Sequence, residues 1–359
     1  MVKKMKQLRI AIIGQGRSGH DIHAHFLLSD DSGRYKVVAV ADSIADRRER
    51  AASEFGCDVY EDYHALLERR DIDLIVNSTF SYEHYPITLE FLRAGFNVLV
   101  EKPFAMHESD CREMIAAAKE SGSRLFVFQQ SRFAPYYTKL REILDSGVLG
   151  RIVQISISFN SFSRRWDWQC SQRFGGGSLY NTGPHPLDQA LDLLGFDPEV
   201  KLIYSKLDRL NSSGDAEDYC KLLLSAPDKP LIDIEISSCD GYPPVTYRIQ
   251  AEHGSLRASI GEIEYKYYVP SDEPERPLIL EPLRGEGGRP IYCSESLGWH
   301  SEKHKLEGSA FDVGTSRYYD MVYRCLFEGR EPEIIPEQSM LQIKLAEQVH
   351  RDNPLPVIY

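Results

Sequence analysis

The chain has 359 residues, which is longer than one hydrophobic core usually serves, so two domains are expected. Its 54 aspartates and glutamates outnumber its 42 lysines and arginines, and the formal net charge is −12 at pH 7. This balance argues against a nucleic-acid partner, because no basic stripe is present to neutralise phosphates, and no apolar run is long enough for a membrane span.

The cysteines and the first residues bear on the compartment. Seven cysteines stand singly along the chain, without a C-x-x-C pair or a metal-ligand spacing. The first residues lead directly into an apolar strand and lack the apolar core of a signal peptide. We therefore expect a cytoplasmic protein with reduced thiols and no bound metal. His20, His23 and His25 share the first predicted helix, where their spacing suits packing and solvent contact better than zinc.

A glycine-rich turn follows the first predicted strand. Residues 8–13 are nearly all apolar, which is typical of a buried parallel strand, and residues 20–28 have the pattern of a helix. Between them, the fingerprint G-x-G-x-x-G is formed by Gly14, Gln15, Gly16, Arg17, Ser18 and Gly19. These glycines allow a tight turn, a close approach of backbone to phosphate, and close packing of helix on strand. The helix N–H groups would then bind the pyrophosphate of a dinucleotide.

The second predicted strand, residues 35–41, ends at Asp42. A carboxylate at this position accepts hydrogen bonds from the adenosine ribose and repels a 2′-phosphate, so we expect NAD, with NADP disfavoured. Arg47 and Arg48 follow, and either residue could face a 2′-phosphate or stack on adenine. The alternative, favoured for Arg48, is a solvated start to a helix over residues 46–55.

The first third of the chain continues as alternating strands and helices. Strands are predicted over residues 73–79, 98–100 and 124–128, and helices over 85–94 and 109–120. This alternation predicts a doubly wound parallel sheet, in which ligands lie beyond the carboxyl ends of the strands. The strand-end residues Thr79, Glu101, Lys102 and Gln130 are therefore candidates for the cofactor side.

From about residue 150 the pattern changes. Apolar and polar residues alternate over 151–159, 219–224, 231–237 and 247–251, and helical patterns return over 186–194 and 316–327. We expect an α/β protein with an N-terminal Rossmann domain, residues 1–130, and a C-terminal α+β domain, residues 131–359, with a mostly antiparallel sheet. Residues 270–313 are rich in proline, glycine and charge and are interpreted as a long loop or insertion.

Several motifs in order along residues 8–195 carry a family resemblance. Besides the glycine turn and Asp42 they are N-S-T-F-S-Y-E-H at 77–84, A-G-x-x-V-x-x-E-K-P at 94–103, R-F-x-P at 132–135, G-V-L-G at 147–150 and G-G-G-S-L-Y-N-T-G-P-H-P-L-D at 175–188. The chain resembles the Gfo/Idh/MocA oxidoreductases, the group that includes glucose–fructose oxidoreductase and inositol dehydrogenase. A weaker echo covers residues 337–350. The segment ending in E-K-P is specific, since few other Rossmann proteins have it.

The resemblance implies an NAD(P)-dependent dehydrogenase or reductase. It would transfer hydride between the nicotinamide and a secondary alcohol of a sugar, cyclitol or glycoside. Ser78 and His84 join the cofactor candidates through their motif. The second domain would be an open sheet whose face closes the active site and commonly forms the interface of a homo-oligomer, a dimer or tetramer.

The resemblance assigns Lys102 and His185 to the chemistry. A cation beside the nicotinamide polarises the substrate oxygen, and a histidine with a pKa near its ordinary 6.5 exchanges a proton near neutrality. The alternatives are an ordinary surface lysine and a structural histidine.

Asn181 departs from the family pattern, which usually has an aspartate four residues before the histidine. Asparagine orients hydroxyl groups but takes no proton. Either His185 alone is the base, with Lys102 as helper, or Tyr180 or Asp188 supplements it. Asp188 lies one helical turn beyond His185 and could hydrogen-bond it, bind substrate or hold the helix.

The segment S-R-R-W-D-W-Q at 163–169 offers aromatic planes and guanidinium groups for an oxygen-rich substrate. We take Arg165 and Trp168 as substrate contacts together with Lys102, Asn181, His185 and Asp188, and expect only one of Trp166 and Trp168 to touch substrate. Trp299 and His300 are weaker candidates for a lid.

Two other functions fit the same residues. One is a non-catalytic sensor of NAD(P) and sugar that regulates transcription through another protein. The other is a glycoside-cleaving enzyme that oxidises a ring carbon transiently and keeps its NAD. Steady release of NADH on adding polyols would separate a dehydrogenase from both.

Overall fold

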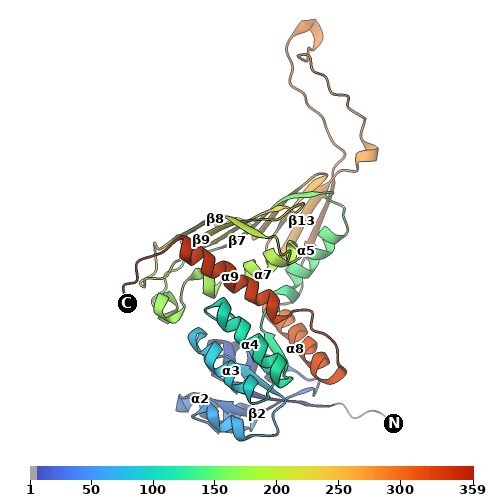
Figure 1. The fold of residues 1–359 in the computed structure, drawn as a ribbon. Coiled ribbons are helices and arrows are strands. Elements are labelled where there is room, and N and C mark those ends of the chain that lie inside the picture. Colours follow the sequence, from blue (N-terminus) through green and yellow to red (C-terminus); the bar gives the residue numbers. More distant parts are fainter. Residues whose placement is uncertain (1–5) are drawn as a thin grey trace, which may run out of the picture.

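The structure is a computed structural model that describes residues 6–359. Its first sheet has six parallel strands in the order β3-β2-β1-β4-β5-β6 (Figure 1). The strands are β1 (Leu8–Ile13), β2 (Tyr35–Ala41), β3 (Asp58–Tyr60), β4 (Leu74–Asn77), β5 (Val98–Val100) and β6 (Leu125–Val127). The helices between them are α1 (His25–Ser29), α2 (Ala45–Phe55), α3 (His84–Arg93) and α4 (Glu108–Ser121). The expected Rossmann sheet is confirmed.

Alternate residues of β1 enter two different cores. Ile10 and Ile12 pack with α1 and α2, whereas Ala11 and Ile13 belong to the core that contains α3 and α4. The helix α8 (Ala310–Glu328), from the far end of the chain, adds Tyr319 to the first of these cores. A late segment of the sequence therefore completes one face of the first sheet, and the expected boundary near residue 130 stays a prediction.

The helix predicted after the glycine turn is present, but it is not an α-helix throughout. A turn of π-helix, η1 (Gly19–Ala24), precedes α1. It directs His23 into the protein, where the ring lies 4.5 Å from that of Phe128 and has no exposed area. The wider turn thus serves a buried polar contact at the end of the first sheet.

The second sheet has eight strands in the order β14-β13-β12-β11-β7-β10-β9-β8, antiparallel except for the β7–β10 pair. These strands are β7 (Ile152–Asn160), β8 (Lys201–Asp208), β9 (Tyr219–Ser225), β10 (Leu231–Ser237), β11 (Tyr247–Ala251), β12 (Gly254–Ala258), β13 (Glu262–Tyr267) and β14 (His300–Lys305). The expected α+β architecture with an open, mostly antiparallel sheet is confirmed.

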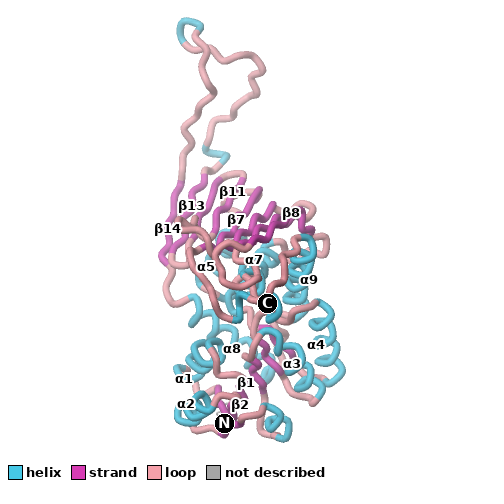
Figure 2. Tube along the Cα trace, turned by 90° about the vertical axis from the view of Figure 1, so that its left-hand side faces the viewer, coloured by secondary structure: helices cyan, strands magenta, loops and turns pink. Residues whose placement is uncertain are grey.

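One face of this sheet is covered and the other is not. Ile155 and Ile232 are paired across β7 and β10 and are buried, whereas their neighbours Ser156 and Asp233 point to the opposite face. The helices α5 (Pro135–Asp145), α7 (Pro184–Leu193) and α9 (Pro336–Asp352) cover the buried face (Figures 1 and 2). No helix of residues 6–359 covers the other face. None of the described helices combines the length and apolar character that crossing a bilayer requires.

The segment 270–313 is not one loop, which corrects the sequence interpretation. Its second part contains β14, paired antiparallel with β13 at the sheet edge, and the start of α8. The strand H-S-E-K-H-K has no apolar residue, so no hydrophobic alternation announces it, as is common for charged edge strands. Residues 270–299 form a long arm that projects from the edge of the sheet (Figures 1 and 2).

Candidate active site

The glycine turn is packed against the end of β4. Gly14 has φ of +87°, and a Cβ there would lie 2.7 Å from the carbonyl oxygen of Ser78. A Cβ at Gly19 would lie 2.0 Å from the carbonyl oxygen of Gly14. The Ser78 hydroxyl donates to the carbonyl oxygens of Ile13, at 3.0 Å, and Gly14, at 2.8 Å. Neither glycine can therefore carry a side chain, and Ser78 holds the turn in place.

Gly16 differs, because the surrounding protein leaves space for a side chain at this position. A Cβ there would meet only the Arg47 guanidinium, at an ordinary 3.7 Å. Packing within the protein therefore does not require glycine here. The absence of a side chain instead leaves the backbone open to an approaching pyrophosphate. The Gln15 side chain is buried, and neither of its polar atoms has a hydrogen-bond partner among the described residues. Both observations fit a dinucleotide.

Asp42 ties the turn to the second strand. Its Oδ2 accepts from the backbone N–H of Gln15 at 2.7 Å and from Arg47 Nη1 at 3.4 Å, and its Oδ1 accepts from the N–H of Ile44 at 2.8 Å. A carboxylate has about four acceptor sites, so ribose hydroxyls can still donate to it. Arg48 donates to the Asp42 carbonyl oxygen, which places it beside the strand end and not in the solvent.

Lys102 stands at the end of β5 and reaches the second domain. Its Nζ donates to the backbone carbonyl oxygen of Asn181 at 3.0 Å. Burial lowers the pKa of Lys102, the Glu101 carboxylate raises it, and the positive charges of Arg17 and Arg165 lower it, so that the pKa lies below its ordinary 10.5. The Lys102 ammonium consequently loses its proton at a lower pH than the ammonium of a surface lysine.

Glu101 is fixed by a buried chain of hydrogen bonds. Its Oε2 accepts from the backbone N–H of Lys102 at 3.0 Å, and its Oε1 lies 3.1 Å from His23 Nε2. His23 Nδ1 lies 2.8 Å from the Tyr319 hydroxyl, so one neutral tautomer donates to Glu101 and accepts from Tyr319. Burial opposes ionisation of Glu101, but His23 and Lys102 lower its pKa overall. Sequence reasoning missed His23, because its partners come from distant segments.

His185 lies in the first turn of α7, with Nδ1 3.1 Å from the Ser131 hydroxyl. Burial and the Lys102 charge lower the pKa of His185 to about 3, far from the ordinary value assumed from the sequence. The imidazole is therefore neutral at neutral pH. His185 is not part of the wall of either cavity described below.

Asp188 does not reach His185, which corrects its interpretation as a histidine partner or a substrate ligand. It is fully buried, and its two oxygens accept from Arg132 Nε, at 2.8 Å, and Nη2, at 2.5 Å. Gln342 of α9 also donates to it, at 2.7 Å. The geometry matches the other alternative, in which Asp188 holds the helix.

Tyr180 likewise offers no free hydroxyl. Its O–H donates to the carbonyl oxygen of Met106 at 3.1 Å, and its ring stacks on that of His350. Burial raises the pKa of Tyr180 above its ordinary value. The proposed supplement to His185 therefore does not come from Tyr180 in this conformation.

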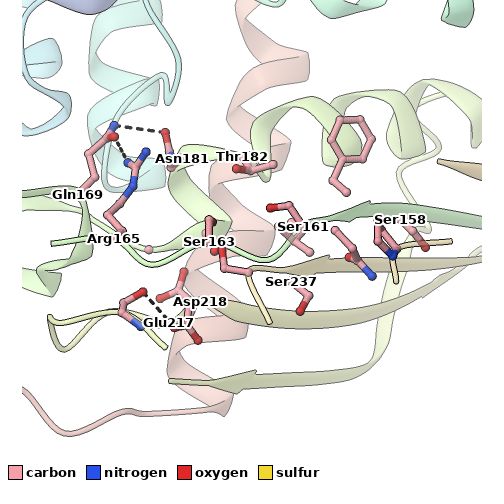
Figure 3. Close-up of a pocket in the computed structure, with 18 of the residues that line it drawn as sticks. Ser158, Ser161, Ser163, Arg165, Gln169, Asn181, Thr182, Glu217, Asp218 and Ser237 are labelled. Atoms are coloured by element: carbon pink, nitrogen blue, oxygen red, sulfur yellow. Dashed lines mark hydrogen bonds between the residues drawn. The ribbon is translucent and has the colours of Figure 1, made fainter. Parts of the chain in front are cut away.

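Two adjoining cavities surround the contact between Lys102 and Asn181. The smaller, of about 60 Å³, is lined on the cofactor side by Ser18, Thr79, His84, Glu101, Lys102 and Trp168. The larger, of about 450 Å³, lies over the ends of β7 and β10 and is lined mainly by serines, threonines and amides, with Arg165 at one side (Figure 3). Gln169 and Asn181 line both cavities.

Gln169 links the predicted substrate residues and was not singled out from the sequence. Its Nε2 donates to Asn181 Oδ1 at 3.2 Å, and its Oε1 accepts from Arg165 (Figure 3). Glu217, also in the wall, is buried and accepts from the N–H of Leu179 at 3.0 Å. A sequence signal exists for it, since the acidic run at 215–218 directly precedes an alternating strand.

The remaining candidates are scattered. Trp168 packs edge-to-face on Phe80, whereas Trp166 is 82% exposed and lines neither cavity. Gln130 is buried at the start of a short turn and belongs to neither cavity. Trp299 and His300 lie at the sheet edge beside the arm and line neither cavity, which corrects their interpretation as a lid.

A glycine turn on a parallel sheet, joined to an open sheet that carries a polar cavity, is the architecture of a Rossmann-type dinucleotide-binding protein. The family model described as an oxidoreductase family with an NAD-binding Rossmann fold matches residues 8–129, and the GFO/IDH/MocA C-terminal domain model matches residues 137–257. The chain belongs to the Gfo/Idh/MocA oxidoreductase family. The resemblance drawn from the sequence is confirmed, and so is NAD as the cofactor of the family.

Individual relatives match over part of their length. An uncharacterized oxidoreductase of Escherichia coli, YdgJ, is 30% identical over 227 residues, which cover 63% of this chain and 64% of that protein. The D-glucoside 3-dehydrogenase of E. coli is 34% identical over 203 residues, 55% of this chain and 56% of that enzyme. The chain thus matches between about half and two thirds of these relatives. The WlbA dehydrogenase of Bordetella pertussis, solved with NADH and UDP-GlcNAcA, shares the fold with a TM-score of 0.75 at 22% identity, over 98% of this chain and 99% of that one.

Proposed function

We propose that this protein is an NAD-dependent dehydrogenase or reductase that acts on a secondary alcohol of a sugar, cyclitol or glycoside. One observation carries the proposal. The Lys102 ammonium lies where a small cavity beside the glycine turn meets a larger polar cavity, and Asn181 belongs to both walls. A hydroxyl group bound in the larger cavity would meet this cation on the side of the cofactor.

The residues divide the work of the reaction. NAD, when bound, supplies the hydride acceptor. Lys102 holds positive charge where the substrate oxygen becomes alkoxide-like, which stabilises the transition state more than the ground state. His185 is neutral and stays the candidate for the hydroxyl proton, although its pKa of about 3 makes it a weak base and it lies outside both cavity walls. The Asn181 amide orients substrate hydroxyls through donors and acceptors without exchanging a proton.

NAD is the preferred dinucleotide in this proposal. Ribose hydroxyls would donate to Asp42, whereas a 2′-phosphate would be repelled by it. Arg47, whose charge would otherwise attract that phosphate, is bound to the same carboxylate. The glycine turn, Ser18, Thr79 and His84 supply the other proposed cofactor contacts, with Glu101 fixing Lys102.

The substrate class follows from the larger cavity. Ser158, Ser161, Ser237 and Thr182 offer hydroxyl groups, and Arg165 offers a guanidinium, so the walls suit a ligand rich in oxygen. Two of the similar proteins are named for sugar ligands that are rich in oxygen, a D-glucoside for the dehydrogenase and UDP-GlcNAcA for the WlbA complex. We place the protein in the cytoplasm, in keeping with its seven free cysteines, and as a homo-oligomer, a dimer or tetramer.

A panel of sugars, cyclitols and glycosides with NAD and NADP tests the proposal. Purified protein should release NADH steadily with at least one member, and the Lys102→Met variant should not. Tightly retained NAD without net NADH, together with cleaved glycoside, would instead support the ring-oxidising alternative. Binding of NAD and sugar without any turnover would support the sensor.

A further inference from the structure

The arm, residues 270–299, has no core of its own. It leaves the sheet after β13, returns at β14, and extends well beyond the body of the protein (Figures 1 and 2). Its apolar side chains lie in water, with Leu278 85%, Leu280 86% and Tyr292 96% exposed. Apolar side chains gathered on one projecting segment mark an interaction site, because scattered single residues are the norm elsewhere on a surface.

The chemistry of the arm keeps it extended. Prolines at 270, 274, 277, 282 and 290 restrict the backbone, which reduces the conformational entropy lost when the arm binds. The two limbs are joined by the ion pair of Arg276 with Glu295, at 2.7 Å, and by a few backbone bonds near the tip. The N–H groups of residues 278–281 have no backbone partner, so this apolar stretch is free to pair with another surface.

The uncovered face of the second sheet has the complementary character. The outward side chains of Arg248, Arg257, Glu264 and Lys303 form one cross-strand row over β11–β14. Arg257 pairs with Glu264 at 2.6 Å and Lys303 pairs with Glu262 at 2.7 Å. Arg248 is exposed, stands opposite Arg257, and has no ion-pair partner among residues 6–359. This part of the face is basic in a chain of net charge −12, whereas the arm has six carboxylates against three arginines.

We propose that the arm of one copy of this chain lies across the uncovered sheet face of a second copy. Leu278, Leu280 and Tyr292 would be removed from water there, and carboxylates of the arm would neutralise Arg248, whereas Arg257 already pairs with Glu264 of its own chain. The inference deepens the homo-oligomer of the proposed function by naming the segment that clasps the partner. In a twofold assembly both arms make the same contact, so the two subunits are joined by two equivalent contacts.

The first test measures assembly. Light scattering during size-exclusion chromatography gives the mass of the full chain, of a Leu278→Asp/Leu280→Asp double variant, and of a Leu28→Asp control. Leu28 is 45% exposed on α1, far from the arm in sequence. We expect a dimer or tetramer that both the full chain and the control keep. The double variant should already dissociate at protein concentrations at least about tenfold higher than those at which the full chain dissociates, as expected when central apolar contacts are lost. A monomeric full chain, or a double variant that assembles like the control, overturns the proposal.

The second test locates the arm directly. Cys293 is exposed on the arm, and a photo-crosslinker can be attached to it in a Cys57→Ser/Cys239→Ser background. Subunits with ordinary and heavy nitrogen are mixed before irradiation. We expect crosslinks between light and heavy chains, from residue 293 to peptides of β11–β14. Crosslinks confined to one chain, or to other surfaces, overturn the proposal.

Neither test uses cofactor or substrate. An inactive protein with the expected crosslinks would therefore refute the enzyme proposal alone, and an active protein without them would refute only the clasp.

Discussion

Lys102 Nζ donates to the main-chain carbonyl oxygen of Asn181 at 3.0 Å. The contact joins the end of β5 in the first sheet to α6 (Ser178–Asn181), the short helix before His185. Because the acceptor is a backbone oxygen, this hydrogen bond forms whether residue 181 is asparagine or aspartate. The departure from the family pattern thus leaves the position of the cation intact and changes only the charge beside it.

Replacing Lys102 by methionine should lower kcat strongly while the affinity for NAD changes little. Methionine keeps the length of the side chain and removes the charge that stabilises the developing alkoxide. Lys102→Arg should restore activity only in part, because the planar guanidinium is larger. Steady-state kinetics and calorimetric titration with NAD measure the two effects. Normal turnover with weakened NAD binding would make Lys102 a cofactor clamp.

The Lys102 charge should set the alkaline limit of activity. Its pKa lies below its ordinary value, so the ammonium is present at low pH and is lost as pH rises through that lowered value. Glu101→Gln removes the carboxylate that raises this pKa, and the alkaline limb of kcat should move to lower pH. A pH profile of both proteins tests this, with Glu108→Gln, an acidic residue on α4, as the control. If the alkaline limb of kcat does not move, the ionisation of Lys102 does not set it.

Asn181→Asp should move the same limb in the opposite direction. The new carboxylate lies next to Lys102 and favours its charged form, so activity should persist to higher pH. The variant should remain active, since Gln169 can donate to an aspartate as it does to Asn181. Loss of all activity would mean that the amide itself is required.

His185→Ala should cost the roughly 10²–10⁴-fold in kcat typical of losing a general base. Because the pKa of His185 is lowered to about 3, its protonation should not reduce activity between pH 5 and 8. The pH profile of the unaltered protein should therefore lack an acid limb near the ordinary histidine value. Activity that survives the substitution would transfer the base role to another residue.

Asp42→Ala should raise the use of NADP relative to NAD, because the repulsion of a 2′-phosphate disappears and Arg47 is released. Ratios of kcat/KM for the two cofactors give the measurement. Equal preference in the unaltered protein would contradict the role given to Asp42.

Asp188→Ala should destabilise the protein by about 3–5 kcal/mol, since it leaves the buried Arg132 guanidinium without its partner. Glu113→Ala breaks the exposed pair with Arg93 and should cost at most about 1 kcal/mol. Urea unfolding of both variants makes the comparison. Similar losses would mean that the Arg132–Asp188 pair is not a structural lock.

The sequence by itself determined the elements whose signals are local. The parallel strands are short apolar runs, the glycine turn has a fixed spacing, and Asp42 and Lys102 stand at strand ends that share one edge of the sheet. The strands β3, β8, β12, β13 and β14 and the helices α5 and α6 were not predicted. In β14 one can see why, because an edge strand exposed on both sides needs no apolar alternation.

Only the tertiary structure decided which polar groups meet. Asp188 follows His185 by one turn, yet it binds Arg132, because burial of that guanidinium requires a carboxylate. His23 contacts Glu101 and Tyr319, which lie 78 and 296 residues away from it in the sequence. The pKa of His185 depends on how completely other segments exclude water from the ring. The arm is exposed because no other segment of the described chain packs against its apolar side chains. Such properties belong to the packed chain, since desolvation and pairing depend on neighbours in space and not on spacing along the sequence.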